Sequence, residues 1–396
     1  MIKRQIWSEI EKYIDKKQAL IITGPRRIGK TTTLNWLLEQ TKSENKLFLD
    51  IENLADRALF EVTDYNDTIT ALEKRGLNFA HKVYLAIDEI QFLPNITSVV
   101  KYLYDHYDIK FFLSGSSSYY LKNYFNESMA GRKFLFELMP LYFNEYLEFV
   151  GEKHIATRYK FEQEPKFDKL LFNTLENHYE DYLEYGGYPE VVMAKTPEIK
   201  QALVAETYST YINQDVMTLA DFKSVTDLRR LVTLLAARIG NRLNTLELAN
   251  VSGLNRETIN NYLEFLEQTY LIATIPVEST SEDVRVRNLR KLYFVDNGIA
   301  SFNAKLSGGQ SFENMMRHQL ATYGKLSYFD NNQSEIDFIL DMDGKKIALE
   351  AKETPTETDL NTLKSVANNK LEVENFTLLG RRKSEKFSRY VWGGSI

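Results

Sequence analysis

A glycine-rich segment near the N-terminus carries the residue types that bind phosphate groups. Residues 24–31 match the pattern G-x-x-x-x-G-K-[ST]. Glycines let backbone N–H groups converge on phosphate oxygens, and a helix that follows adds partial positive charge at its N-terminus. We expect the Lys30 ammonium to reach the β- and γ-phosphates of a nucleotide and the Thr31 hydroxyl to bind Mg²⁺. The candidate nucleotide-binding residues are Gly24, Pro25, Arg26, Arg27, Ile28, Gly29, Lys30, Thr31 and Thr32.

A pair of carboxylates follows a second apolar run. Residues 83–87 are mostly apolar and are followed directly by Asp88 and Glu89. Open α/β sheets bind ligands at the carboxyl ends of their strands. We therefore expect Asp88 to hold Mg²⁺ and Glu89 to orient and polarise the water that attacks the γ-phosphate. A strand that runs into an acidic helix cap is the alternative, and the phosphate loop upstream favours the metal-binding interpretation over it.

A third apolar run, residues 110–113, leads into a segment of serine and glycine, residues 114–118. A polar side chain at this strand end could bridge the attacking water and the γ-phosphate. We assign this role to Ser116, with Ser114 as the alternative. A plain serine–glycine turn explains the segment almost as well.

Four short apolar runs in the first 150 residues predict the strands that position these groups. Because the runs are almost continuously apolar and are separated by helical segments, they favour a parallel sheet with helices on both faces. The expected strands are 19–23, 46–50, 83–87 and 109–113.

A second set of charged residues lies near the C-terminus. Two runs, residues 335–340 and 346–352, flank the hairpin signal Asp343-Gly344. Alternation along the second run places Glu350 and Lys352 on one face, and strand pairing can bring Asp337 beside them. The simplest alternative is a hairpin with charges exposed on one face.

These C-terminal residues could form a metal-dependent site. Clustered carboxylates repel one another, so they favour a divalent ion that neutralises them. We expect Asp337 and Glu350 to bind that ion, with Glu313, on a helix predicted over residues 311–323, as a further ligand. The metal, Mg²⁺ or Mn²⁺, would activate water, and Lys352 would orient it or stabilise a phosphate.

Residues 245–263 have the pattern of a helix-turn-helix, in which Asn255 can cap the second helix. The second helix of such a motif usually reads a DNA groove. Acidic residues on the same helix, Glu257 and Glu264, favour the alternative of a protein-packing module. The candidate DNA contacts are Arg256, Asn260 and Asn261 on the helix, and Arg285, Arg287, Arg290 and Lys291 on a wing predicted over residues 280–292.

Several of these segments together resemble the AAA-plus ATPases of the archaeal-type ATPase group, which are P-loop NTPases. The resemblance rests on residues 24–31, 87–91, 113–116, 130–132, 138–147 and 185–190. It implies an AAA-plus core, a helical region, a winged helix and a C-terminal restriction-endonuclease-like domain. Residues 337–352 are similar to the D…E-x-K pattern of such domains. It also implies that Arg132 could be an arginine finger acting on a neighbouring subunit of a homo-oligomer, and the alternative is a structural ion pair.

Composition is consistent with a multidomain globular protein. The chain has 396 residues, a net charge of -6 and no cysteine, which excludes disulfides and thiolate metal sites. We expect a cytoplasmic protein without a membrane span, because no apolar run approaches about 20 residues. The expected domains are 1–150 (AAA-plus core), 151–235 (helical region), 236–304 (winged helix) and 305–396 (restriction-endonuclease-like).

Together these features favour an ATP-binding and ATP-hydrolysing α/β protein that acts on DNA, with nucleotide-controlled, metal-dependent cleavage as one form of that action. The alternative is an ATP-driven switch whose C-terminal domains bind protein partners without cleaving DNA. A nucleotide-binding scaffold without useful turnover is a further alternative.

Overall fold

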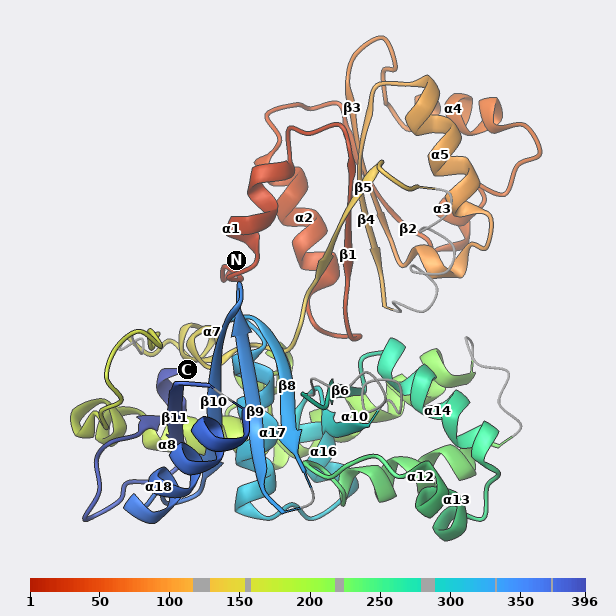
Figure 1. Ribbon diagram of the computed structural model, residues 1–396. Helices are drawn as coiled ribbons and strands as arrows, with labels where there is room; N and C mark the ends of the chain where they lie inside the picture. Colours follow the sequence, from red (N-terminus) through yellow and green to blue (C-terminus); the bar gives the residue numbers. More distant parts are fainter. Residues whose placement is uncertain (117–128, 154–157, 218–223, 279–288, 332, 372) are drawn as a thin grey trace. The chain divides into compact units, whose positions relative to one another are not determined.

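The computed structural model describes residues 1–116, 129–153, 158–217, 224–278, 289–331, 333–371 and 373–396 (Figure 1). The chain forms two compact units. The first comprises Met1–Met139 and Gln268–Tyr270, and the second comprises Pro140–Glu267 and Leu271–Ile396. Among the described residues, no helix is both long enough and apolar enough to cross a membrane.

The first unit is built on a five-stranded parallel sheet with the strand order β2-β3-β4-β1-β5. This confirms the predicted parallel α/β sheet. Its fifth strand, at one edge, was not predicted from the sequence, because its short run lacks the continuous apolar character of the others. The strands are β1 (Ala19–Thr23), β2 (Lys46–Asp50), β3 (Val83–Asp88), β4 (Ile109–Gly115) and β5 (Lys133–Glu137).

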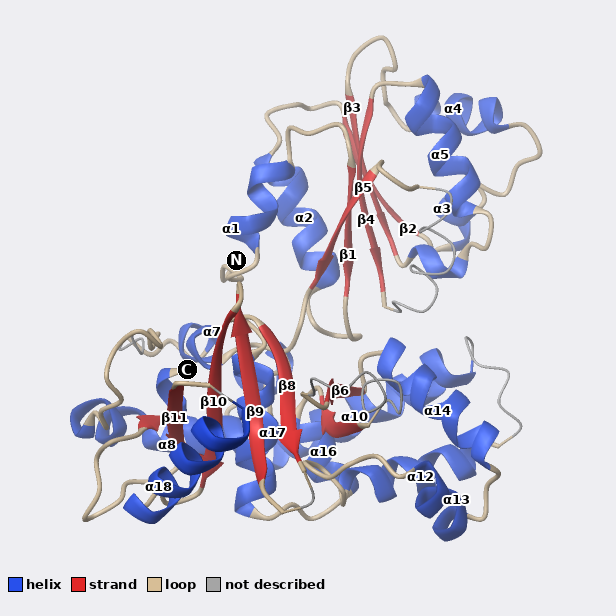
Figure 2. Ribbon diagram, viewed as in Figure 1, coloured by secondary structure: helices blue, strands red, loops and turns tan. Residues whose placement is uncertain are grey.

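Helices cover both faces of this sheet, with α1 and α2 on one side and α3, α4 and α5 on the other (Figure 2). Every residue of β1 and β4 is buried, as expected for strands enclosed between two helical layers. The helices are α1 (Trp7–Ile10), α2 (Lys30–Gln40), α3 (Leu54–Arg57), α4 (Tyr65–Lys74) and α5 (Ile96–His106), with 3-10 turns at Glu11–Tyr13 and Ile90–Phe92.

The second unit begins with a helical region. Two of its helices, α13 and α14, stand where the helix-turn-helix was predicted, and the Asn255 side chain accepts a hydrogen bond from the Thr258 N–H at 2.8 Å. An antiparallel pair, β6 (Ile272–Pro276) and β7 (Arg290–Phe294), follows. The helices are α7 (Phe143–Phe149), α8 (Lys169–Tyr185), α9 (Pro189–Met193), α10 (Pro197–Thr210), α12 (Val225–Ala236), α13 (Thr245–Ser252), α14 (Arg256–Gln268) and α16 (Asn297–Asn303), with a π-helical turn at Tyr211–Val216.

A second five-stranded sheet, of order β12-β11-β10-β9-β8, completes this unit. Strands β8, β9 and β10 are antiparallel neighbours, whereas β10, β11 and β12 run parallel. Asp343 and Gly344 both have positive φ, 53° and 91°, which confirms the predicted hairpin turn. The strands are β8 (Lys325–Asp330), β9 (Glu335–Met342), β10 (Lys345–Lys352), β11 (Asn375–Gly380) and β12 (Val391–Trp392), with helices α17 (Gly308–Leu320) and α18 (Glu357–Val366).

Aromatic side chains join the helical region to this sheet. The Trp392 ring on β12 lies 6.2 Å from the ring of Phe143, 5.5 Å from that of Phe172 and 5.2 Å from that of Tyr179, each at a steep angle. Such edge-to-face contacts add to the stabilisation from burial. Strand β12 therefore packs on α7 and α8.

Candidate functional site

The glycine-rich loop joins β1 to α2 at the carboxyl edge of the parallel sheet. Gly24 has φ of 145°, and a Cβ atom there would lie 2.0 Å from the Leu138 carbonyl oxygen, so only glycine fits. Gly29 is left-handed, with φ of 97°, and immediately precedes the first turn of α2. Because the first N–H groups of a helix lack intrahelical partners, this turn is suited to phosphate oxygens.

Lys30 is buried at the start of α2. Its Nζ donates hydrogen bonds to the carbonyl oxygens of Gly24, at 3.2 Å, and Pro25, at 2.9 Å. The same atom lies 3.9 Å from Glu89 Oε1. The ammonium is thus held inside the loop mainly by neutral carbonyl groups, which phosphate oxygens can replace as stronger, charged acceptors.

The residues predicted to bind Mg²⁺ lie together. Thr31 Oγ1 donates a hydrogen bond to Asp88 Oδ2 at 2.5 Å, and the Ser114 hydroxyl donates to the other carboxylate oxygen. Burial raises the pKa of Asp88, and the hydrogen bonds from Ser114 and Thr31 oppose that shift. Hydroxyl and carboxylate oxygens are the hard donors that Mg²⁺ takes, so this pair fits that ion.

Glu89 stands beside this pair in a left-handed conformation, with φ of 52°. The 3-10 turn that follows brings Gln91 back toward the strand ends. Gln91 Nε2 donates to Glu89 Oε2 and also, at 2.9 Å, to the Ser116 hydroxyl. Gln91 therefore links the predicted water-orienting carboxylate to the predicted polar residue of β4. The sequence did not reveal this link, because it depends on the left-handed turn.

The N-terminal segment supports the loop from behind. Arg4 is buried and donates hydrogen bonds to the carbonyl oxygens of Ile28, at 3.0 Å, and Met139, at 2.7 Å. Trp7 stacks on Trp36, with 4.5 Å between ring centroids. No motif in the sequence indicates this support, because Arg4 lies 24 residues before Ile28 and 135 residues before Met139.

Arg132 makes an ion pair with Asp105, with 3.0 Å between Nε and Oδ1, and both side chains are about one-third exposed. This is the structural alternative to an arginine finger. The role of Arg132 toward a neighbouring subunit stays a prediction.

In the second unit, the β9–β10 hairpin brings Asp337, Glu350 and Lys352 together, as the alternation predicted. Asp337 Oδ2 accepts a hydrogen bond from the Ala351 N–H at 3.0 Å. Glu350 accepts from the Asp337 N–H at 3.3 Å and from Lys352 Nζ at 2.7 Å. Burial, and next the charge of Asp337, raise the pKa of Glu350 to about 8.

A buried lysine on strand β7 also contacts this cluster. Lys291 on β7 is only 2% exposed, and its Nζ lies 3.4 Å from both Glu313 Oε1 and Asp337 Oδ1. It also pairs with Glu335. Burial by itself would lower the pKa of Lys291, but the surrounding carboxylates raise it above the usual value. The expectation that Lys291 contacts phosphate from an exposed wing is therefore wrong.

The metal set of Asp337, Glu350 and Glu313 stays a prediction. Within the described ranges, no group of three or more acidic or histidine side chains is arranged to hold a metal ion. The physical reason is that Lys291 contacts Glu313 and Asp337, while Glu350 hydrogen-bonds to Lys352 and the β9 backbone. Burial and the charge of Asp337 raise the pKa of Glu313 to about 7.

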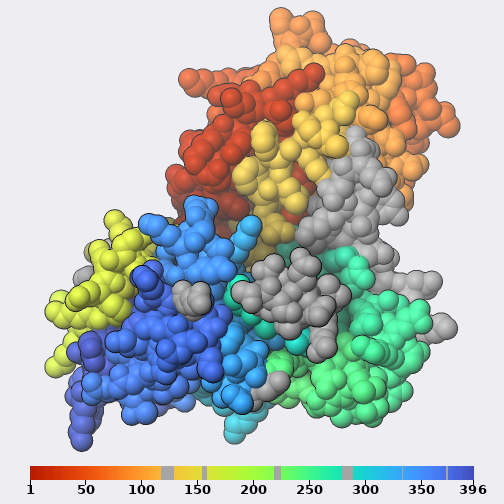
Figure 3. Space-filling view, in the orientation of Figure 1, coloured from red at the N-terminus to blue at the C-terminus, as the bar shows by residue number. Residues whose placement is uncertain are grey.

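Helices α13 and α14, which were predicted to form a helix-turn-helix, carry both basic and acidic exposed side chains. The residues of α12–α14 belong to the green region on the molecular surface drawn in Figure 3. Asn260 is exposed, and Arg256 donates to the Thr245 hydroxyl at 3.1 Å. Arg290 is held by Glu267 at 2.9 Å. Arg285 and Arg287 lie outside the described residues.

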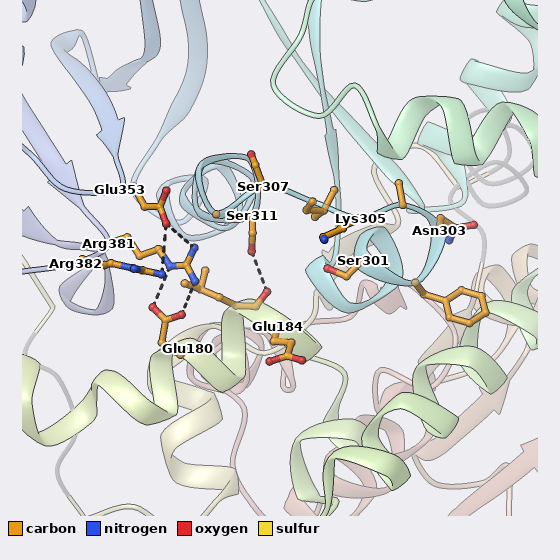
Figure 4. A pocket seen from close by; sticks show the side chains of 15 residues that line it. Glu180, Glu184, Ser301, Asn303, Lys305, Ser307, Ser311, Glu353, Arg381 and Arg382 are labelled. Carbon is orange, nitrogen blue, oxygen red and sulfur yellow. Dashed lines mark hydrogen bonds and ion pairs between the residues drawn. The ribbon is translucent and has the colours of Figure 1, made fainter.

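A cavity of about 760 Å³ lies elsewhere in the second unit, between α8, α16 and the start of α17. Figure 4 shows Arg381 between Glu180 and Glu353, with Arg382 beside Glu353. The arginines of this cavity are thus neutralised by glutamates of the same unit. We assign it no ligand.

Comparison with known families identifies the first unit. Residues 16–147 match the family model described as an AAA domain. This part of the chain is an AAA-type P-loop NTPase domain. Residues 176–310 match a domain of unknown function (DUF8612), and residues 308–391 match another (DUF4143). The AAA domain contains the loop, the Asp88–Glu89 pair and both serines.

Whole-chain relatives exist in distant organisms. An uncharacterized protein of Methanocaldococcus jannaschii is 25% identical over 387 residues, which cover 94% of this chain and 84% of the relative. An uncharacterized protein of Haemophilus influenzae is 26% identical over 387 residues, covering 91% of this chain and 90% of the relative. Among solved structures, the Aeropyrum pernix ORC2 protein has a TM-score of 0.46 at 13% identity, over 81% of this chain and 95% of that chain.

Proposed function

We propose that this protein binds and hydrolyses ATP, and that the AAA domain acts as a nucleotide-driven switch for the second unit. The observation that carries this proposal is the convergence of Lys30, the Thr31–Asp88 pair and the Glu89–Gln91–Ser116 chain at one edge of the parallel sheet. These groups supply the phosphate-binding, metal-binding and water-positioning functions that phosphoryl transfer to water needs.

Each group has a defined part in the reaction. Lys30 exchanges its carbonyl partners for β- and γ-phosphate oxygens. Thr31 and Asp88 would hold Mg²⁺, which would neutralise charge on the phosphate oxygens. Glu89 orients and polarises the attacking water, and Ser116 or Ser114 fixes that water relative to the γ-phosphate.

Two variants test the proposal. Lys30→Ala should abolish tight ATP binding while the protein remains folded. Glu89→Gln should retain binding and lower kcat by about 100-fold or more, the range expected for loss of a positioned general base. Labelled-ATP binding and phosphate release measure the two effects. Exposed residues of the same domain provide the matched controls Lys74→Ala and Glu39→Gln. Equal phosphate release by the unmodified protein and Glu89→Gln would refute the ATPase assignment.

We propose DNA as a second ligand, bound by the helix-turn-helix of α13 and α14. The support is the element order, in which β6 and β7 follow α14 as a wing would, together with Arg256 and Asn260 on the exposed face of α14. Exposed Glu257 and Glu264 on the same helix favour a protein partner instead. Fluorescence anisotropy with labelled duplex DNA should show salt-dependent binding that Arg256→Ala weakens. Binding that is absent at low salt would favour the protein partner.

For the C-terminal sheet we favour recognition over DNA cleavage. The observation behind this choice is that Lys291 contacts two of the three acids predicted to bind the catalytic metal. Incubation of end-labelled single- and double-stranded DNA with Mg²⁺ or Mn²⁺, with and without ATP, tests it beside a Lys352→Ala control. Cleavage that this control abolishes would restore the nuclease hypothesis.

A further inference from the structure

The side chain of Lys291 ends in an environment made almost entirely of acidic groups. Its Nζ is 3.4 Å from Glu313 Oε1 on α17 and 3.4 Å from Asp337 Oδ1 on β9, and it pairs with Glu335 at the start of β9. The Tyr328 ring lies 5.5 Å from the same atom. Three carboxylates and one aromatic face thus surround a single positive charge, which belongs to the chain itself.

The hydrogen bonds of the neighbouring groups complete this arrangement. The Tyr293 hydroxyl donates to Glu313 Oε1 at 2.8 Å, and the Ala351 N–H donates to Asp337 Oδ2 at 3.0 Å. Glu350 receives Lys352 on one oxygen and the Asp337 N–H on the other. Buried charges are tolerated when they are paired and hydrogen-bonded in this way.

A divalent ion bound by the same carboxylates would compete with Lys291 for space and charge. Carboxylate oxygens bind Mg²⁺ and Ca²⁺ at about 2.0–2.6 Å, so an ion shared by Glu313 and Asp337 would lie in the space between them. The Lys291 ammonium already lies within 3.4 Å of both. Two cations at such a short distance in a buried site repel each other strongly.

We propose that Lys291 is the resident cation of this cluster and takes the position that a divalent metal would require. The intact protein then holds Asp337 beside Glu350 without a metal ion. The cluster also fixes β7 to the C-terminal sheet, because Lys291 comes from β7 whereas the acids come from α17 and β9. This inference does not depend on ATP hydrolysis.

Mn²⁺ binding, followed by electron paramagnetic resonance without nucleotide, tests the proposal. All proteins carry Asp88→Asn, which removes the candidate metal ligand of the AAA domain. The parent should show no stoichiometric Mn²⁺ binding. Lys291→Met keeps a side chain of similar length without its charge, and it should gain one Mn²⁺ per chain. Adding Asp337→Asn should abolish that gain, and the exposed-lysine control Lys325→Met should behave as the parent.

Two results would overturn the proposal. One is stoichiometric Mn²⁺ binding by the parent that Asp337→Asn removes, since the metal would then fit beside Lys291. The other is a folded Lys291→Met protein that binds no Mn²⁺. If Lys291→Met does not fold, thermal unfolding of the parent with increasing Mn²⁺ decides. A melting temperature that Mn²⁺ raises in the parent, but not in Asp337→Asn, contradicts the proposal, and an unchanged one supports it.

Discussion

Each unit of the molecule holds a buried lysine close to carboxylates, and the two lysines have different surroundings. In the AAA domain, Lys30 is held mostly by two loop carbonyls, and its nearest carboxylate oxygen is 3.9 Å away. In the second unit, Lys291 contacts three carboxylates. The first ammonium can exchange weak neutral partners for a ligand. The second already has the anionic partners that a buried ammonium needs, and it therefore serves the structure.

The largest expected effect is on the free energy of unfolding when each of the two lysines is replaced in turn by methionine. Lys291→Met should lower the free energy of unfolding by about 3–5 kcal/mol, because it leaves buried carboxylates without their cation. Lys30→Met should change it less, by about 1–2 kcal/mol, since it loses two hydrogen bonds to neutral carbonyls and one carboxylate contact at 3.9 Å. Urea titrations followed by circular dichroism measure both. Similar losses for the two variants would remove the distinction between the sites.

A buried acid that accepts hydrogen bonds from backbone N–H groups extends the comparison. Asp296 is buried, and burial raises its pKa to about 6 although the N–H groups of Gly187 and Ile299 donate to it. The folded protein therefore binds the proton of the Asp296 carboxyl group more tightly than the unfolded chain, in which the pKa of this group is 3.8. The associated stabilisation is present below about pH 4 and is lost as the pH rises through about 6, a loss of about 3 kcal/mol.

Asp296→Asn tests this prediction, because asparagine does not titrate. It keeps an oxygen acceptor for only one of the two N–H groups, since Gly187 and Ile299 donate to different carboxylate oxygens. Urea titrations at several pH values between 4 and 7 should show a flatter pH dependence in the variant. An identical dependence in both proteins would assign the titration to another group.

The link through Gln91 should have an intermediate effect. Gln91→Ala frees the Glu89 carboxylate from Ser116, so Glu89 orients the attacking water less well. We expect kcat to fall about 10-fold with KM unchanged, which is within the range for small misplacements of catalytic groups. Steady-state ATP hydrolysis measures this, with Gln40→Ala, an exposed glutamine of α2, as the control. A change confined to KM would place Gln91 in binding instead.

The smallest effect is expected at Arg132. Because its pair with Asp105 is partly exposed, Arg132→Ala should cost less than about 1 kcal/mol of stability. Arg75→Ala, which breaks another ion pair of the AAA domain, is the matched control. If ATP hydrolysis also falls by orders of magnitude in Arg132→Ala but not in Arg75→Ala, Arg132 acts as an arginine finger.

The sequence predicted the first site better than the second for a physical reason. Phosphate binding depends on contiguous backbone, so residues 24–31 and the Asp88–Glu89 pair could be found from spacing alone. Alternation and the Asp343-Gly344 turn likewise predicted that Asp337 would meet Glu350. The position of Lys291 could not be predicted, because it depends on how β7 packs against α17 and β9. A basic residue after a helix-turn-helix looks the same whether it faces solvent or a buried acid.

The stacked pair of Trp7 and Trp36 has a spectroscopic consequence. The chain has three tryptophans, and the ring planes of these two are 9° apart. Trp7 also donates to the Thr33 hydroxyl at 3.0 Å, in the first turn of α2, next to the phosphate-binding loop. Their coupled electronic transitions should therefore respond to nucleotide at Lys30, whereas emission from Trp392 should follow the packing of β12. The unlabelled protein thus carries a separate optical reporter in each unit.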